Sequence, residues 1–521
     1  MQYILLTLVN GSIMRIEYLC HSCLYIETEE TSLVIDPWIK GGAYLNQWQL
    51  FPKPVNTAML DDVKNIVFSH GHEDHLHPES MQELPKEATI YFPFQWRKGV
   101  KEYLKEMSFN KVVEGVSFKK YSLSKDTSIT FLGFALESVI VIEHKGKVIV
   151  NINDALNSHH ENVVKMFLAE IKKRWTDIDY LFSGWSGAGY FPNTVHYKDK
   201  DDVEVAKIRE QYFANNFCKS IQYLQPDVAI PFAPGFVLLA DDKRWINDIK
   251  FPRELLEEYY KKYFDKDTKT KFCIVNPGDY FDEAGFHEVS PYYKEQINGS
   301  LNHQIDSTYA KEIIEINHVE FIGEDAVKLL QDNLLAFINW NKKLFDKTVL
   351  AEAKFAVQLK DMKTPDYFNF DYDNEKFYIT RTKEIKKDRK LLITTDSKLL
   401  SHSISRDWGG DVLTIGYGID VYVIDEKALE QNLDIVCVRL LTKYPTASES
   451  LSKHPLRAMS YFIRHPMMGK LALKQKITLR SAVNKFPYNE RDHWINFTKC
   501  ELCRVCNMPL FSFEYGESLT V

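Results

Sequence analysis

The sequence of 521 residues lacks the features of membrane-spanning and nucleic-acid-binding proteins. No apolar run approaches the roughly 20 residues that a membrane-spanning helix needs. Basic residues are not in excess, because 65 Lys and Arg face 72 Asp and Glu and the net charge is −7. This balance argues against nucleic acid as a partner. It leaves room for a small-molecule substrate, including an anionic one that binds in a local basic pocket.

Cysteine is scarce and forms no disulfide framework. Three of the eight Cys lie near the end of the chain and the others are scattered, which predicts a cytoplasmic protein. The apolar start of the chain has no basic flank and no clear cleavage site, so a secretory signal is a poor fit. Residues 1–13 are instead predicted to be an upstream extension. The sequence shows no internal repeat and no low-complexity run.

The most informative stretch is residues 69–77, Ser-His-Gly-His-Glu-Asp-His-Leu-His, which follows a short apolar run that predicts a buried strand. Four of the 16 His of the chain fall within eight positions here, which chance does not readily produce. Imidazole and carboxylate groups suit zinc, iron or manganese, and a loop can turn several of them toward one point. The stretch therefore predicts a metal site, and its potential ligands are His70, His72, Glu73, Asp74, His75 and His77.

The pattern His70-x-His72-x-Asp74-His75 resembles the signature of the metallo-β-lactamase superfamily. The resemblance implies an α/β fold, an αββα sandwich, with two zinc ions or alternatively iron or manganese. It implies that His70 and His72 hold the first metal and that Asp74 and His75 hold the second. Glu73 falls on a variable position of the pattern and receives no role. His77 lies outside the pattern and is predicted to be a supporting or surface residue.

The same resemblance assigns roles to residues outside the metal loop. It implies that Asp36, in Asp36-Pro37-Trp38, braces the loop by hydrogen bonds and that His21 also stands behind the ligands. Asp154 would bridge the two metals, the alternative being a helix N-cap. His196 would be the last ligand of the second metal, the alternative being a surface histidine.

The chain departs from the superfamily pattern at the third histidine of the first metal. No His lies between His77 and His144, and His144 is predicted at a hairpin tip, which is a poor ligand position. Glu137 falls near the aligned spot and could supply a carboxylate instead, which hard metals such as iron tolerate. Alternatively, Glu137 is a surface residue and the first metal is weakly held, of different identity or absent.

A narrower resemblance covers roughly residues 14–290. The segments Asp36-Pro37-Trp38, 151–154, 182–184 and 231–234 resemble the metallo-β-lactamase-like part of the CMP-N-acetylneuraminate hydroxylases and their bacterial relatives. Those proteins are iron oxygenases that also carry a Rieske iron–sulfur module. A Rieske centre needs paired Cys-x-His and Cys-x-x-His elements, and this sequence contains no such pairs.

The length predicts more than one domain. We expect a metallo-β-lactamase-like domain over 1–290, a helical connector over 291–346 and a smaller α+β accessory domain over 347–521. In the last of these, 353–359, 377–380, 390–394 and 412–415 are predicted strands. Near the end, Cys500, Cys503 and Cys506 could hold a zinc ion or an iron–sulfur cluster, or be unligated thiols.

These patterns support hypotheses from different functional classes. The leading one is a metal-dependent hydrolase that uses a metal-activated water on an ester, amide or phosphodiester, with Asp74 as a catalytic residue. The first alternative is an iron-dependent oxygenase that receives electrons from a partner or from a cluster at Cys500. The second alternative is a non-catalytic binding scaffold.

Overall fold

The fold is known from a computed structural model, which describes residues 14–94, 99–134, 137–156, 161–198, 200–289, 301–444 and 455–474. Residues 1–13 and the three Cys near the end therefore lie outside the described residues, and the predictions made for them stay predictions. Among the described residues, no helix combines the length and the apolar composition that a bilayer crossing requires.

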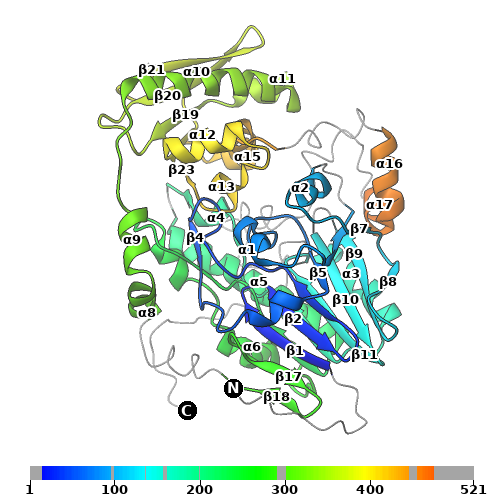
Figure 1. The fold of residues 1–521 in the computed structure, drawn as a ribbon. Helices are drawn as coiled ribbons and strands as arrows, with labels where there is room; N and C mark the ends of the chain where they lie inside the picture. Colours follow the sequence, from blue (N-terminus) through cyan, green and yellow to red (C-terminus); the bar gives the residue numbers. More distant parts are fainter. Residues whose placement is uncertain are drawn as a thin grey trace.

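Two large sheets form the first part of the molecule (Figure 1). The first sheet has eight strands in the order β18-β17-β1-β2-β3-β5-β6-β7. Its strands are β1 (Met14–Cys20), β2 (Cys23–Thr28), β3 (Ser32–Ile35), β5 (Asn65–Val67), β6 (Thr89–Pro93), β7 (Val112–Gly115), β17 (Tyr280–Asp282) and β18 (Gly285–His287). A small separate pair joins β4 (Trp48–Leu50) to β15 (Phe236–Leu238).

The second sheet has seven strands in the order β16-β14-β12-β11-β10-β9-β8. Its strands are β8 (Lys120–Ser122), β9 (Thr127–Phe134), β10 (Glu137–His144), β11 (Lys147–Asn153), β12 (Tyr180–Ser183), β14 (Val228–Pro231) and β16 (Lys271–Phe272). Strand β10 shows why the two sheets stack. Its Ile140 and Ile142 join the core between the sheets, whereas Val139 and Val141 face the helices on the other side.

Helices cover the outer faces of both sheets. On the first sheet lie α1 (Pro78–Glu83) and α2 (Val100–Glu106), and on the second lie α3 (Glu161–Arg174), α5 (Asp202–Leu224) and α6 (Leu256–Tyr263). The order helix, sheet, sheet, helix is the αββα sandwich that the sequence predicted. A short helix, α4 (Tyr190–Asn193), precedes β13 (Val195–His196).

The C-terminal unit, which we define as residues 347–444, contains a third, six-stranded sheet in the order β13-β23-β22-β19-β20-β21. Five of its strands come from the unit itself, namely β19 (Phe355–Leu359), β20 (Tyr367–Asp373), β21 (Lys376–Thr382), β22 (Leu391–Thr395) and β23 (Ile419–Val423). Its helices are α11 (Lys347–Glu352), α12 (Ser397–Ser405), α13 (Asp411–Thr414), α14 (Lys427–Glu430) and α15 (Leu433–Leu440). The sixth strand, β13, belongs to the sandwich part of the chain.

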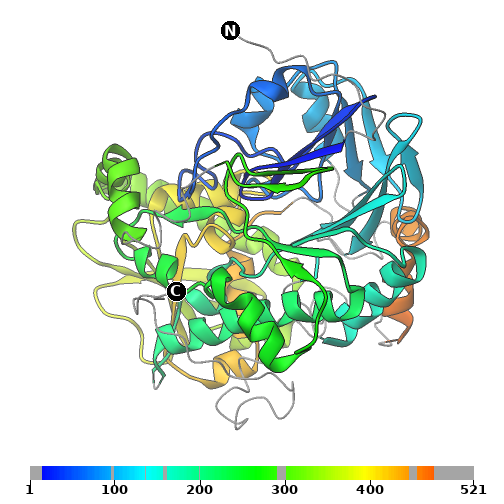
Figure 2. The same cartoon turned by 90° about the horizontal axis from the view of Figure 1, so that it is seen from below.

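Three further helices precede the C-terminal unit: α8 (Leu301–Thr308), α9 (Ala310–Ile316) and α10 (Glu324–Asn341). Two others, α16 (Pro455–Arg464) and α17 (Pro466–Lys474), follow it and lie beside the second sheet in both views (Figures 1 and 2). The strand predicted over 412–415 is wrong, because this stretch lies in the helix α13 and the turn after it. A stretch of four residues is too short to show the periodicity that separates a helix from a strand.

Candidate metal centre

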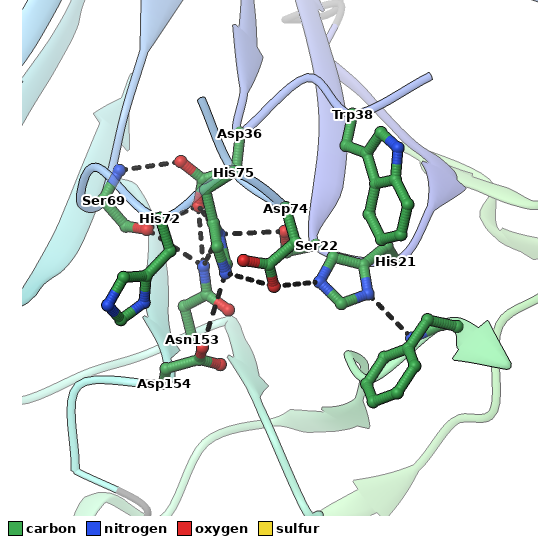
Figure 3. Close-up of polar contacts among 12 residues, drawn as sticks. His21, Ser22, Asp36, Trp38, Ser69, His72, Asp74, His75, Asn153 and Asp154 are labelled. Atoms are coloured by element: carbon green, nitrogen blue, oxygen red, sulfur yellow. Dashed lines mark hydrogen bonds and ion pairs between the residues drawn. The ribbon is translucent and has the colours of Figure 1, made fainter. Parts of the chain in front are cut away.

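The predicted metal loop follows β5 at the edge of the sandwich where several strands end. Asp36 follows β3 in the same sheet, and Asp154 follows β11 in the opposite sheet. The loop between β5 and α1 therefore faces residues from both sheets (Figure 3). His77 ends the loop as the N-cap of α1, where its side chain accepts a hydrogen bond from the Ser80 backbone N–H.

His70 and His72 present ring nitrogens to the same point. His70 Nε2 lies 2.7 Å from His72 Nδ1. Ser69 Oγ donates its proton to Asp36 Oδ2 at 2.6 Å. The Ser69 oxygen therefore accepts a hydrogen bond from His70 Nδ1, which is 2.9 Å away. The Nε2 of His70 is then the nitrogen with a free lone pair. Burial, together with the neighbouring His75 and His72, holds the pKa of His70 well below its usual range, which keeps it neutral as a metal ligand must be.

His75 lies among three carboxylates from different parts of the chain. Its Nε2 is 3.2 Å from Asp74 Oδ2 and 3.4 Å from Asp154 Oδ2. Its Nδ1 is 3.1 Å from Asp36 Oδ2 and 3.1 Å from Ser22 Oγ. Burial alone would lower the pKa of His75, but Asp74 and Asp36 raise it well above its usual range.

Asp36 gathers several hydrogen bonds behind the loop residues that we expect to be ligands. Its carboxylate is fully buried and accepts from the Ser69 backbone N–H at 2.8 Å and from Asn153 Nδ2 at 2.6 Å. Together with the contacts to Ser69 Oγ and His75, these bonds fix the orientation of both imidazoles. A carboxylate behind a histidine is the usual way to set which ring nitrogen faces a metal.

His21 also stands behind a ligand, on the other side of the loop. The Gly235 backbone N–H donates to His21 Nδ1 at 2.9 Å. In neutral His21 the proton is therefore on Nε2, which lies 3.0 Å from Asp74 Oδ2 and donates to it (Figure 3). This tautomer leaves no lone pair on Nε2 for a metal, and His21 acts on the centre through Asp74.

Glu137, at the start of β10, joins the cluster. One ligand atom each from His70, His72 and Glu137 lies within 4.8 Å of the others. Two similar groups are formed by His70, His75 and Asp154 and by His21, Asp74 and His75. Burial, and then the nearby Asp154, raise the pKa of Glu137 well above its usual range.

The donor set fits a metal ion by two observations. Among the described residues, Glu137 Oε2 is buried without a hydrogen-bond partner, which is costly for an atom of this kind unless a cation binds it. Asp36, Asp74, Asp154 and Glu137 also bring four carboxyl groups into one region. A divalent cation would offset the resulting repulsion between their charges.

Other residues that the sequence singled out lie elsewhere or bond differently. Both ring nitrogens of His196 are engaged, Nδ1 with Asp202 Oδ2 at 2.8 Å and Nε2 with Asp420 Oδ1 at 3.1 Å, and we leave His196 out of the proposed ligand set. His77 bonds Ser80 and the Gly42 carbonyl. Cys500, Cys503 and Cys506 lie outside the described residues.

Several contacts of the centre carried no signal in the sequence. Tyr44 donates its hydroxyl proton to Asp74 Oδ1 at 2.5 Å, and burial, followed by the charge of Asp74, raises the pKa of Tyr44 well above its usual range. Burial lowers the pKa of His72. The charge of Asp411, a buried residue of the C-terminal unit, acts in the opposite direction.

Comparisons with known proteins agree with this geometry. A family model described as a beta-lactamase superfamily domain matches residues 15–168. A cytidine monophosphate-N-acetylneuraminic acid hydroxylase from Danio rerio is 25% identical over 295 residues, which are 52% of this chain and 46% of the relative. The inactive human counterpart is 23% identical over 253 residues, 45% of this chain and 48% of the relative. The chain thus spans about half the length of these curated relatives.

Solved structures show weaker similarity. CmlA, a diiron beta-hydroxylase from Streptomyces venezuelae, is 15% identical with a TM-score of 0.34, covering 52% of this chain and 54% of that one. An isothiocyanate hydrolase from Delia radicum gut bacteria is 14% identical with a TM-score of 0.35, and the match covers 51% of this chain and 98% of that one. Residues 15–168 thus match a beta-lactamase superfamily domain, and over about half its length the chain is similar to the cytidine monophosphate-N-acetylneuraminic acid hydroxylases.

Proposed function

We propose that the protein is an iron-dependent oxygenase that hydroxylates a small molecule at a centre of two metal ions. The observation that carries this proposal is Glu137, whose carboxylate joins the two imidazoles of His70 and His72. A set of two His and one carboxylate is typical of non-haem iron oxygenases, whereas zinc hydrolases of this superfamily use a third His. The hydroxylase names of the curated relatives support the same choice.

The second metal position would be formed by Asp74, His75 and Asp154. The six ligands of the two positions thus contain three imidazoles and three carboxylates. Carboxylate oxygens are hard donors and favour iron or manganese over softer ions. Bound iron would supply the reductive activation of dioxygen, which is the chemistry that hydroxylation requires.

In this proposal, the residues of the chain bind the metal ions, orient the ligand side chains and limit the access of water. Ser69 and Asp36 set the rings of His70 and His75, as described above. His70, Asp74 and His75 are all less than a twentieth exposed, which keeps bulk water away from these three side chains, whereas Asp154 is partly open to solvent. Burial raises the pKa of Glu73 to about 7, although a hydrogen bond from the Tyr44 backbone N–H acts in the opposite direction. Glu73 can therefore hold or release a proton near neutral pH.

The reaction needs electrons from outside the described residues. Hydroxylation breaks a C–H bond and forms C–OH with one oxygen atom of dioxygen, and the other oxygen atom leaves as water. Two electrons and two protons balance this equation. Because the sequence contains no Cys-x-His and Cys-x-x-His pairs for a Rieske cluster, we expect the electrons to come from a partner or from a cluster at Cys500.

The test is metal loading followed by exposure to dioxygen. The metal-free chain is reconstituted with Fe²⁺ under nitrogen, and elemental analysis is expected to give about two iron per chain. Stoichiometric dioxygen uptake with a chemical reductant, and a change in visible absorbance on mixing, are the expected results. Iron that binds without any dioxygen uptake contradicts the proposal.

Variants at Glu137 sharpen this test. Glu137→Ala removes one ligand and should lower iron loading toward one per chain. Glu137→His restores the three-His set, and it should shift the preference of the first position from iron toward zinc in a competition between the two ions. An unchanged preference in Glu137→His would mean that Glu137 is not a ligand.

A metal-dependent hydrolase is the second candidate. It is favoured by Glu73, because a carboxyl group with a pKa near 7 beside a metal centre can act as a general acid or base in hydrolysis. In this case the zinc-loaded chain would hydrolyse an ester, amide or phosphodiester, and Asp74 would orient the attacking water. Hydrolysis by the zinc form, lost in Glu73→Gln and without dioxygen uptake by the iron form, distinguishes this candidate from the oxygenase.

A further inference from the structure

Tyr44 lies in a turn with an unusual backbone. The φ angle is 55° at Tyr44, 59° at Leu45 and 66° at Asn46, so consecutive residues other than glycine occupy the left-handed region. This conformation is unfavourable for L residues and persists where surrounding contacts hold it. Such strained segments cluster at functional sites, and we therefore asked what this turn positions.

The turn brings the Tyr44 hydroxyl to a proposed metal ligand. Tyr44 is fully buried and donates to Asp74 Oδ1 at 2.5 Å, while His21 donates to Asp74 Oδ2 at 3.0 Å. Each oxygen of the carboxylate thus has its own donor. With both donors in place, Oδ2 is the oxygen that faces His75 Nε2, 3.2 Å away. Tyr44 and His21 together fix how Asp74 is presented to the second metal position.

The C-terminal unit holds this turn from outside the sandwich. Gln47 Nε2 donates to the Tyr44 carbonyl at 2.8 Å and to the Val412 carbonyl, in α13, also at 2.8 Å. Gly416, after α13, approaches so closely that a Cβ added there would lie 2.7 Å from the Tyr44 Cβ. One amide nitrogen therefore ties the strained turn to a helix that is 365 residues away in sequence.

We propose that Tyr44 is a positioning residue for Asp74 and that the C-terminal unit keeps it in place through Gln47, so that metal binding at the second position depends on both parts of the chain. This inference rests on the proposed metal centre and not on the reaction that the centre performs. It gives the C-terminal unit a specific task in the metal site.

The test is a titration of the metal-free full chain with Co²⁺, whose visible absorbance reports binding at each position. Asp154→Ala first identifies which of the two equivalents belongs to the second position. Tyr44→Phe and Gln47→Ala are each expected to weaken that equivalent by roughly 10- to 100-fold and to leave the other equivalent unchanged. Gln47→Glu keeps the length of the side chain but has no N–H to donate, and it should behave like Gln47→Ala.

Matched variants control for a general loss of stability. Tyr309→Phe removes the hydrogen bond of another buried tyrosine hydroxyl, to the Leu50 carbonyl. Asn339→Ala removes an amide nitrogen that bonds the carbonyls of Leu335 and Phe377. Both should bind two equivalents with the affinity of the original chain. Thermal unfolding of all variants without metal shows whether any affinity change follows stability alone.

The possible outcomes separate the inference from the proposed function. If the original chain binds no Co²⁺, the metal centre itself is refuted. If it binds two equivalents and Tyr44→Phe does the same with equal affinity, the positioning role is wrong while the metal centre stands. Equal weakening of both equivalents in Tyr44→Phe, or weakening in the control variants as well, also overturns the role of Tyr44.

Discussion

Asp36 is the residue on which most hydrogen bonds of the metal centre converge. It is fully buried, follows β3 with a φ of 47°, and contacts Ser69, Asn153 and His75. Asp36 connects both sheets to the metal loop. It follows a strand of the first sheet, Ser69 belongs to the loop, and Asn153 ends β11 of the second sheet. The loss of its charge should therefore affect ligand orientation before it affects the fold.

Asp36→Asn is expected to weaken metal binding by roughly 10- to 100-fold, the usual effect of removing a group that orients ligands. An amide nitrogen would face the donors of Ser69 and Asn153, which should also lower the free energy of unfolding by about 1–3 kcal/mol. Competition with a chelator and unfolding in urea measure the two quantities. Asp282→Asn, at the β17–β18 hairpin, is the control, and the prediction fails if both variants bind metal equally well.

The proposed metal ligands differ in how far the sequence could predict them. His70, His72, Asp74 and His75 are neighbours in sequence, so their spacing alone suggested a metal site. Glu137 emerged only because the expected third His was missing. The contacts of Tyr44 and Asp411 depend on how distant segments pack, and no local pattern encodes that packing. His196 was singled out as a ligand by its position before a helix. The sequence could not show that Asp202 and Asp420 bond both of its ring nitrogens.

The buried His465, between helices α16 and α17, helps to attach these helices to the sandwich, together with Tyr461, Met467 and Met468 in the apolar core. His465 Nε2 donates to the Phe94 carbonyl at 2.5 Å, and Ser117 Oγ donates to His465 Nδ1 at 2.6 Å. Ser117 Oγ itself accepts from the Gly133 backbone N–H at 2.8 Å. Burial lowers the pKa of His465 to about 4, so the imidazole is neutral in the folded state.

The attachment should weaken in acid. In an unfolded chain His465 would titrate near 6.5, so its contribution is complete above that pH and is lost as the pH falls from 6.5 toward 4. The loss can reach about 3 kcal/mol. Hydrogen exchange of residues 455–470 at pH 7 and pH 4.5 measures it. His465→Gln should abolish this pH dependence, and equal protection at both pH values would refute the attachment.

Strand β13 joins the sandwich to the sheet of the C-terminal unit. Val195 and His196 pair in parallel with Val421 and Tyr422 of β23. Asp420, next to this pair, also bonds Lys243 and Lys360, and it holds its negative charge in a buried position. Asp202 and Asp420 raise the pKa of His196 to about 9 although its partial burial acts in the opposite direction.

This junction should weaken in alkali, opposite to the attachment at His465. Because the pKa of His196 is raised, its contribution is complete below about 6.5 and is lost as the pH rises through 9. The ring is 27% exposed, so solvent screening reduces the effect to about 1–2 kcal/mol. Melting temperatures at pH 7 and pH 9.5 measure it. His196→Gln should show a smaller difference, whereas His402→Gln, on α12, should not alter it.

Short elements were the part of the fold that the sequence could not specify. The apolar run before residue 69 was sufficient to predict the buried strand β5. Strand β13 has only two residues, and α13 has only four. Their conformations are set by partners in the other part of the molecule, because so few residues carry no periodic pattern.

The sandwich and the C-terminal unit share one apolar core. The largest cluster of buried residues contains Trp38 and Tyr44 from the sandwich part together with Val357, Leu413 and Tyr417 from the C-terminal unit. The pairing of β13 and the Gln47 bridge cross the same boundary. The extent of this contact indicates that the parts unfold together.

Calorimetry of the full chain should therefore show a single cooperative transition for these two parts. A shortened chain that ends at residue 346 should melt at a lower temperature and bind less metal at the position of Asp74. Its exposed apolar surface should also promote aggregation. Two well-separated transitions in the full chain, with the shortened chain retaining the melting temperature of the first, would contradict this expectation.

The pairing of Val195 and His196 with β23 has a practical consequence for protein engineering. Consider a chimera in which residues 347–444 are exchanged for the equivalent part of a homologue. Its incoming sheet would then have to pair with the original strand β13, which lies outside the exchanged segment. If the two do not match, β23 is left with unpaired backbone groups that invite intermolecular pairing. Transplants should therefore carry residues 194–202 along with the C-terminal segment.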